Sequence, residues 1–120
     1  MRFLFTTIQF TEADFYARVS EHLRDGHGHE VAHVVVSRRA TEAMRARGLD
    51  ARCLPDLMAS AAPLDLAAET ERLEASYDTP SLRDVWLTDP ACAGRPEAWC
   101  LERTVRCFRA LERAFDDVGP

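Results

Sequence analysis

The sequence contains no lysine and no asparagine, and all 15 of its basic residues are arginine. Its 20 acidic residues outnumber them, which gives a net charge of −5. Domains that bind nucleic acid through its phosphates concentrate positive charge on one face. The composition therefore argues against a nucleic-acid partner. An arginine-only basic set is typical of a GC-rich coding bias.

Long apolar runs are also missing. No stretch approaches the roughly 18 apolar residues that span a membrane as a helix. Residues 1–10 lack the small-residue cleavage site of a signal peptide, and Glu12 and Asp14 follow at once. We therefore expect a soluble protein with no transmembrane segment, located in the cytoplasm.

The common cofactor and metal motifs are absent. Neither GxGxxG nor GxxxxGK[ST] occurs, so the chain has no glycine cradle for a dinucleotide and no P-loop. The cysteines at 53, 92, 100 and 107 form no CxxC pair, and the histidines at 22, 27, 29 and 33 match no familiar zinc spacing. We expect no metal, no cofactor and free thiols, with His33 inside a strand.

What the sequence does contain is an α/β pattern in its first half. Apolar segments at 2–8, 31–36 and 49–54 predict strands, the last ended by Pro55. A helix capped by Thr11 follows the first strand, with Phe15, Val19 and Leu23 as its apolar stripe. Ser37 caps a second helix that ends at Gly48. This order predicts a parallel sheet in a three-layer Rossmann-like α/β fold, with helices on both faces and the first strand central.

The second half reads as helices and loops. We expect a loop at 58–63, a helix at 65–75, a short turn from a Thr79-Pro80 cap to Leu87, and a long last helix opened by Pro96. The length of 120 residues fits one domain. Three strands make a thin sheet, however. We therefore predict a single Rossmann-like domain over 1–120 that forms the N-terminal half of a longer two-domain protein or of a two-chain assembly.

The turn after the first strand is the first candidate site. In open α/β sheets, ligands gather at the carboxyl ends of strands and at helix N-termini. Thr6, Thr7 and Gln9 offer hydroxyl and amide groups there, and Glu12 is the nearest carboxylate. The alternative is a plain polar turn, with Glu12 as a first-turn acid favoured by the helix dipole.

The second candidate is the segment from Tyr77 through Ser81 to Arg83. It combines an aromatic ring, a rigid proline turn and a guanidinium, and Arg83 can hold a phosphate bidentately. The alternative is a capped short helix with Arg83 paired to Asp84 or Asp89 on the surface.

The turn LRDGHGHEV at residues 23–31, together with the strand that starts MRFLF, resembles the N-terminal domains of GT-B glycosyltransferases of surface or capsular polysaccharide synthesis. The stretch from Tyr77 to Arg83, Asp89 and the long helix that ends DVGP are similar to the same domains, so the resemblance covers most of the chain. The resemblance implies a domain that binds a sugar acceptor. The nucleotide-sugar would be bound by a missing C-terminal domain or a partner chain. Gln9-Phe10-Thr11 departs from the family's first loop, so the catalytic residue is unknown.

Two other classes of function remain open. The chain can be a non-catalytic α/β partner subunit that completes its fold, or an active site, by pairing with another chain. It can also be a small flavodoxin-like binding module, although Thr6-Thr7 gives only a hint of a flavin loop.

Overall fold

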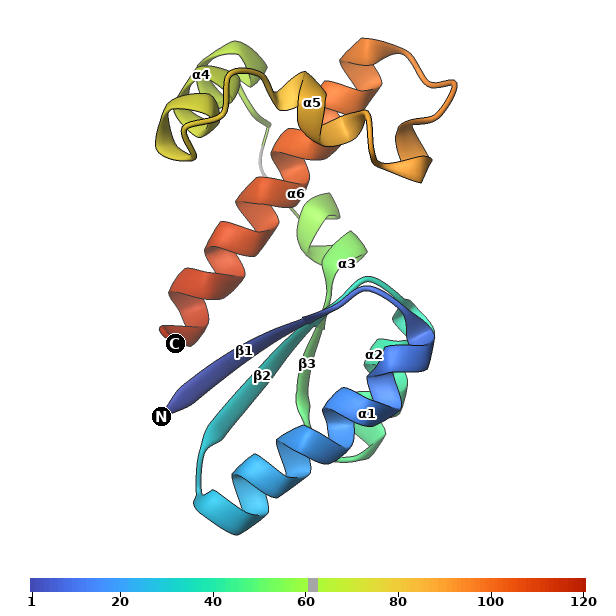
Figure 1. The fold of residues 1–120 in the computed structure, drawn as a ribbon, viewed down its shortest axis with the longest axis vertical. Helices are drawn as coiled ribbons and strands as arrows, with labels where there is room; N and C mark the ends of the chain where they lie inside the picture. The colour runs from blue at the N-terminus through green and yellow to red at the C-terminus, as the bar shows by residue number, and fades with distance from the viewer. Residues whose placement is uncertain (61–62) are drawn as a thin grey trace. The chain divides into compact units, whose positions relative to one another are not determined.

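The computed structural model describes residues 1–60 and 63–120 and has a mixed α/β architecture (Figure 1). Within these ranges, no helix is both long enough and apolar enough to cross a membrane. The chain divides into two compact units. Unit 1 comprises residues 1–60 and 110–120, and unit 2 comprises 61–109.

The sheet belongs to unit 1 and consists of β1 (Arg2–Thr7), β2 (Glu30–Val35) and β3 (Asp50–Cys53). Both strand pairs are parallel, which confirms the predicted β-α-β connections. The strand order is β1-β2-β3. The prediction that the first strand is central was therefore wrong for the described residues. β2 is buried on both faces at Ala32–Val35, whereas the apolar residues of β1 are only half-buried.

Two helices, α1 (Phe10–Glu21) and α2 (Arg38–Ala46), pack on one face of this sheet. Their core contains buried residues from α1, β2, α2 and β3, among them Ala13, Ala17, Val35, Met44 and Ala51. The predicted stripe on α1 was wrong, because α1 buries the small side chains of Ala13, Ala17 and Ser20 while Phe15 is 64% exposed. Small side chains let the helix approach the sheet closely.

The sequence predicted the capping residues of these helices only in part. Gln9, and not Thr11, is the N-cap of α1. Ser37 caps α2 as predicted, since its hydroxyl accepts the Ala40 N–H at 3.3 Å. Gly48 follows α2 with a φ of +74°, a left-handed conformation that favours glycine. Between α1 and β2 lies a π-helical turn, η1 (His22–Gly26).

After β3 the chain turns into α3 (Leu54–Ala59). Met58 and Ala59 are therefore helical where a loop was predicted, and residues 61 and 62 of that predicted loop lie outside the described residues. Pro55 ends the strand as expected, but it does so by occupying the first turn of a helix, where no backbone N–H is required.

Unit 2 is helical. It contains α4 (Leu66–Ser76), α5 (Leu82–Trp86), a 3₁₀ turn η2 (Pro90–Cys92) and the first part of α6 (Glu97–Val118). Its core is built on Leu73, Leu82 and Val105. The long last helix is confirmed. The Thr79-Pro80 cap was wrong, because Ser81 is the N-cap of α5 and accepts the Arg83 N–H at 3.2 Å.

The last turns of α6 belong to unit 1 and contact its sheet. Arg2 of β1 donates to the Val118 carbonyl oxygen at 3.4 Å, and Arg52 of β3 donates to the Asp117 carboxylate at 3.1 Å. Side chains alternate along a strand, and Arg52 is paired in register with Val34, not with Val35. These contacts therefore lie on the face of the sheet opposite α1 and α2.

Candidate functional site

The candidate site in unit 1 is the carboxyl edge of the sheet. β1 ends at Thr7 and β2 at Val35, and each strand leads within three residues into a helix. The Val36 N–H donates to the Thr7 carbonyl oxygen at 3.1 Å, and this bond holds the carboxyl ends of β1 and β2 side by side. The N-termini of α1 and α2 therefore both open at this edge, where parallel α/β sheets bind ligands.

The two threonines at the end of β1 lie in different environments. Thr6 is exposed, whereas Thr7 is 1% exposed and lies on the face covered by α1 and α2. The Thr7 hydroxyl oxygen is buried and has no hydrogen-bond partner in the described part of the chain. Thr6 is therefore available to a ligand in solution, and Thr7 contributes mainly to packing beneath the site.

Gln9 and Glu12 form the start of α1. The Gln9 backbone N–H donates to the Glu12 carboxylate at 3.4 Å, and the Glu12 N–H donates to the Gln9 carbonyl oxygen at 3.2 Å. Both side chains are exposed. Glu12 is thus an acidic residue in the first turn of α1, where its carboxylate accepts a backbone N–H, as its position in the sequence suggested. A carboxylate has about four acceptor positions, so this long bond leaves acceptor capacity for a ligand.

Sequence reasoning missed the residues that join the two helix N-termini. The Arg39 guanidinium lies over the Phe10 ring, 4.6 Å from its centroid, although Phe10 remains 45% exposed. Arg38 pairs with Asp56 of α3 at 2.5 Å. The signal was available in the sequence, because Ser37-Arg38-Arg39 follows the second strand directly, as Gln9 and Phe10 follow the first.

The second predicted group lies in unit 2 and does not form one cluster there. Tyr77 packs against Phe108, with ring centroids 5.3 Å apart, and the Ser81 hydroxyl is used as the α5 cap. Arg83 pairs with Glu97 at 3.3 Å, and not with Asp84 or Asp89. Only Arg83 of the three lines a groove of about 360 Å³, which also includes Trp86 and Arg95.

The histidines divide into one buried residue and one surface group. His33 is fully buried in β2, where its Nε2 is 2.9 Å from the Ser20 hydroxyl. Burial lowers the pKa of His33, and nearby Asp50 opposes that shift. At the α1–β2 turn, the Nε2 atoms of His22 and His27 are 3.3 Å apart. Across the described ranges, no group of three or more His, Cys, Asp or Glu side chains is arranged to hold a metal ion.

The cysteines are free thiols, and three of them are buried. The pKa of Cys92 is raised to about 11, mainly by burial and secondly by a hydrogen bond with Cys100. Burial also raises the pKa of Cys107. A raised pKa keeps a thiol protonated near neutral pH, which is the opposite of what a nucleophilic cysteine requires.

The chain matches no protein-family profile, no curated protein and no solved structure. It offers exposed amide, hydroxyl and carboxylate groups beside a half-exposed aromatic ring at the carboxyl edge of a parallel sheet. This combination suits the binding of a polar ligand that also has an apolar face.

Proposed function

We propose that the chain is the acceptor-side domain of a cytoplasmic glycosyltransferase that transfers a sugar from a nucleotide-sugar in polysaccharide or glycoconjugate synthesis. The observation that carries the proposal is the carboxyl edge of the sheet, where Thr6, Gln9 and Glu12 are exposed beside Phe10. The resemblance to GT-B N-terminal domains, which covers most of the chain, gives the proposal its reaction class.

The chemistry of this edge fits a sugar. A pyranose ring has an apolar face that packs on an aromatic ring and a rim of hydroxyl groups that hydrogen-bond to amides and carboxylates. Phe10 supplies the ring, and its pairing with Arg39 holds it in place. Gln9 and Glu12 supply the polar groups from the first turn of α1, a rigid element that suits positioning.

A three-layer Rossmann-like arrangement is part of the same proposal. Helices α1 and α2 form one outer layer, and the contacts of Arg2 and Arg52 with the end of α6 support a second layer on the other face.

Transfer requires more than this chain. Catalysis depends on holding donor and acceptor together in a reactive geometry. The sequence has no glycine-rich loop for a diphosphate, so the nucleotide-sugar is assigned to a further domain or a partner chain. We expect the isolated 120-residue chain to bind nucleotide-sugars weakly or not at all in calorimetry, and to turn none over.

The direct test is a titration of the ¹⁵N-labelled chain with a panel of mono- and oligosaccharides, followed by amide chemical shifts. We expect the shifts to concentrate at Thr6, Gln9, Phe10 and Glu12. Glu12→Gln should weaken binding by roughly tenfold, because hydrogen bonds to charged groups contribute about 1.5–3 kcal/mol. Glutamine suits the same position of a helix N-terminus, so α1 should remain intact.

Glu42→Gln is the matched control, since Glu42 is an exposed glutamate on α2 away from its N-terminus. It should leave the affinity unchanged. Saccharide binding that maps to Arg83 and Trp86 of unit 2 instead, or that survives in Glu12→Gln, would show that the site has been assigned wrongly. Tight binding or turnover of a nucleotide-sugar by this chain would contradict the proposal that a further domain or a partner chain binds the donor.

A second candidate function is a non-catalytic partner subunit. The observation that favours it is β1, whose Phe3, Leu4 and Phe5 are only half-buried although they form the most apolar stretch of the chain's first strand. The third reading, a small flavodoxin-like module, predicts a yellow protein when flavin is bound, and absorbance of the purified chain tests it.

A further inference from the structure

The free edge of β1 has a defined set of backbone groups. The Thr7 carbonyl accepts from Val36 and the Met1 carbonyl accepts from Glu30, so the odd-numbered residues of β1 direct their polar groups toward β2. Backbone groups alternate along a strand. The N–H and C=O groups of Arg2, Leu4 and Thr6 therefore point away from the sheet, where no strand pairs with them in the described part of the chain.

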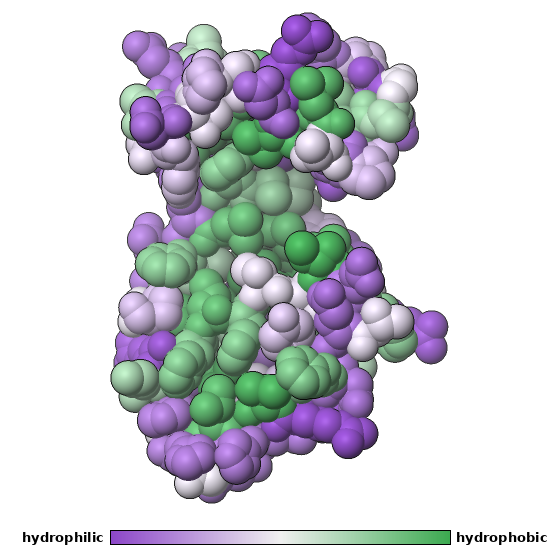
Figure 2. Space-filling view, in the orientation of Figure 1, coloured by the Kyte–Doolittle hydropathy of each residue, from purple (hydrophilic) through white to green (hydrophobic). Residues whose placement is uncertain are grey.

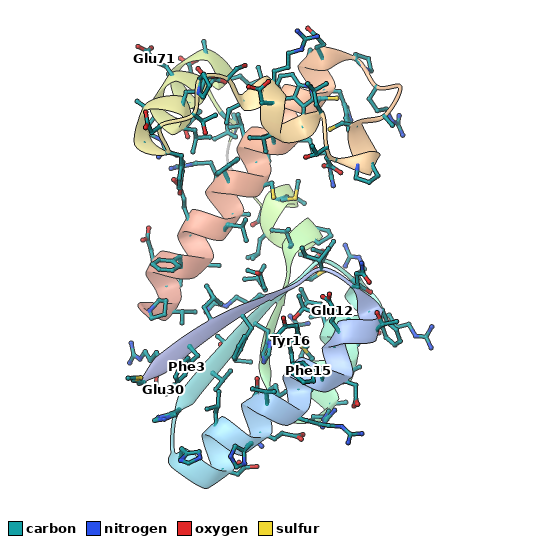
Figure 3. All side chains as sticks on the ribbon, in the orientation of Figure 1. Phe3, Glu12, Phe15, Tyr16, Glu30 and Glu71 are labelled. Carbon is teal, nitrogen blue, oxygen red and sulfur yellow. The ribbon has the colours of Figure 1, made fainter. Side chains whose placement is uncertain are left out.

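An aromatic row runs beside this edge on the α1 face. Phe3 stacks with Phe5 at 6.5 Å between ring centroids, and Phe5 contacts Tyr16 of α1 at 5.5 Å. Tyr16 in turn contacts Phe15 at 5.4 Å. We call these four residues the aromatic row. Figure 3 shows Phe3, Tyr16 and Phe15 on β1 and α1, and in Figure 2 hydrophobic side chains gather over the visible face of unit 1.

Tyr16 joins the row to β1 on the flank of α1 that faces away from α2. On the opposite flank, Asp14 and Glu21 both pair with Arg47, which follows α2, at 2.9 and 2.6 Å. That flank is thus closed by ion pairs within the chain. On the other flank, Tyr16 contacts Phe5 of β1, and its neighbour Phe15 is 64% exposed. A free edge with a neighbouring apolar surface is a template for strand addition.

Among possible occupants, a second copy of the chain fits in one register. In an antiparallel pair, hydrogen-bonded residues lie opposite each other and alternate with non-hydrogen-bonded ones. Centring the pair on Leu4 places Leu4 opposite its own copy and Arg2 opposite Thr6, so every outward-pointing group finds a partner. The same register places Phe3 opposite the second copy's Phe5, in the closer type of pair.

This register also meets the other demands of a symmetric interface. A two-fold axis perpendicular to the sheet keeps both copies of α1 on the same face, so the two aromatic rows meet. The Arg2 side chains fall at opposite ends of the paired segment, about four residues or 13 Å apart along the strands, which avoids repulsion between like charges.

We propose that two copies of this chain dimerise through antiparallel pairing of their β1 strands, forming a continuous six-stranded sheet and burying the aromatic row. The dimer goes beyond the proposed function and does not depend on it. It leaves Gln9 and Glu12, beyond the carboxyl end of the paired strand, free to bind a ligand.

The test is the oligomeric state of the full chain, measured by sedimentation velocity from low to high micromolar concentration. We expect a concentration-dependent dimer. Phe15→Lys should weaken dimerisation by about tenfold or more, as expected for loss of a buried aromatic contact. Phe115→Lys is the matched control, because Phe115 is 57% exposed on α6, and it should leave the dimer unchanged. Both substitutions are at exposed helix positions that folding does not require.

Hydrogen exchange identifies the pairing. The amides of Leu4 and Thr6 should gain protection as the concentration rises, whereas the Phe5 amide, which points toward β2, should be protected throughout. A monomer at every concentration would overturn the proposal and would favour a strand from a different chain at this edge. A dimer that leaves the Leu4 and Thr6 amides unprotected, or that withstands Phe15→Lys, would overturn it equally.

Discussion

Acidification should destabilise the protein through one histidine. His33 is fully buried, its Nε2 is 2.9 Å from the Ser20 hydroxyl, and its ring lies 5.5 Å from that of Phe5. Burial lowers its pKa below the ordinary value of 6.5, and the charge of Asp50 only partly offsets this. The folded state therefore keeps His33 neutral at a pH where the unfolded chain already binds a proton.

The sign and size of the effect follow from that difference. Above about pH 6.5 both states are neutral and the stability from His33 is fully present. As the pH falls below 6.5, the unfolded state gains a proton and stability decreases, with a slope of up to about 1.4 kcal/mol per pH unit until His33 is protonated in the folded state too. Glu21 and Asp25 have lowered pKa values, so the stability they contribute is lost only below about pH 4.5 and 3.8.

The assay is urea unfolding at a series of pH values between 7.5 and 5, read by circular dichroism. The double variant Ser20→Ala/His33→Leu removes both partners of the buried pair and should flatten the slope in this window. His27→Gln is the control, because His27 is exposed, and it should retain the wild-type slope. An unchanged slope in the double variant would refute the assignment of this pH dependence to His33.

Three further predictions concern packing, an ion pair and a thiol. Met44→Ala should cost about 2–5 kcal/mol in urea unfolding, because Met44 is 1% exposed in the core between α1, α2 and the sheet, whereas Met44→Leu should cost less than about 1.5 kcal/mol. Arg47→Gln should lower stability at neutral pH, and the difference from wild type should shrink below about pH 4.5, because Arg47 lowers the pKa of Glu21. Cys92, with its pKa raised to about 11, should react slowly with iodoacetamide at pH 8 in the native protein and quickly in urea, as mass spectrometry would show.

The sequence predicted most of the local structure because local structure depends on periodicity and caps. The apolar segments at 2–8 and 31–36 predicted β1 and β2 to within about two residues, and Ser37 and Gly48 predicted the limits of α2. The order of the strands was not predictable in the same way. An apolar run shows that a strand is buried somewhere, but not whether its neighbour lies on one side or both. β1 is apolar at Phe3, Leu4 and Phe5 and still lies at the edge.

The candidate site was predicted in part. The rule that ligands collect at strand ends pointed to Thr6, Thr7, Gln9 and Glu12, and three of these are exposed there. Alternation along β1 separates Thr7 from Thr6 by turning it to the buried face. Arg39 was missed because its partner, Phe10, is 29 positions away in the chain. Only the parallel pairing of β1 with β2 brings the two helix starts together.

The misassigned face of α1 has a physical consequence. Both Phe15 and the alanines at 13 and 17 follow helical periodicity, and the larger side chain suggested the buried face. The fold buries the alanines instead and leaves Phe15 in solvent, beside half-buried Tyr16, Phe5 and Phe3. Exposed apolar area costs about 25 cal/mol for each Å², so a continuous row of four such side chains favours association. The row adjoins the edge of β1, whose outward backbone groups match those of its own copy. The two features that the sequence did not predict, the edge position of β1 and the exposure of Phe15, therefore have one explanation in the proposed dimer.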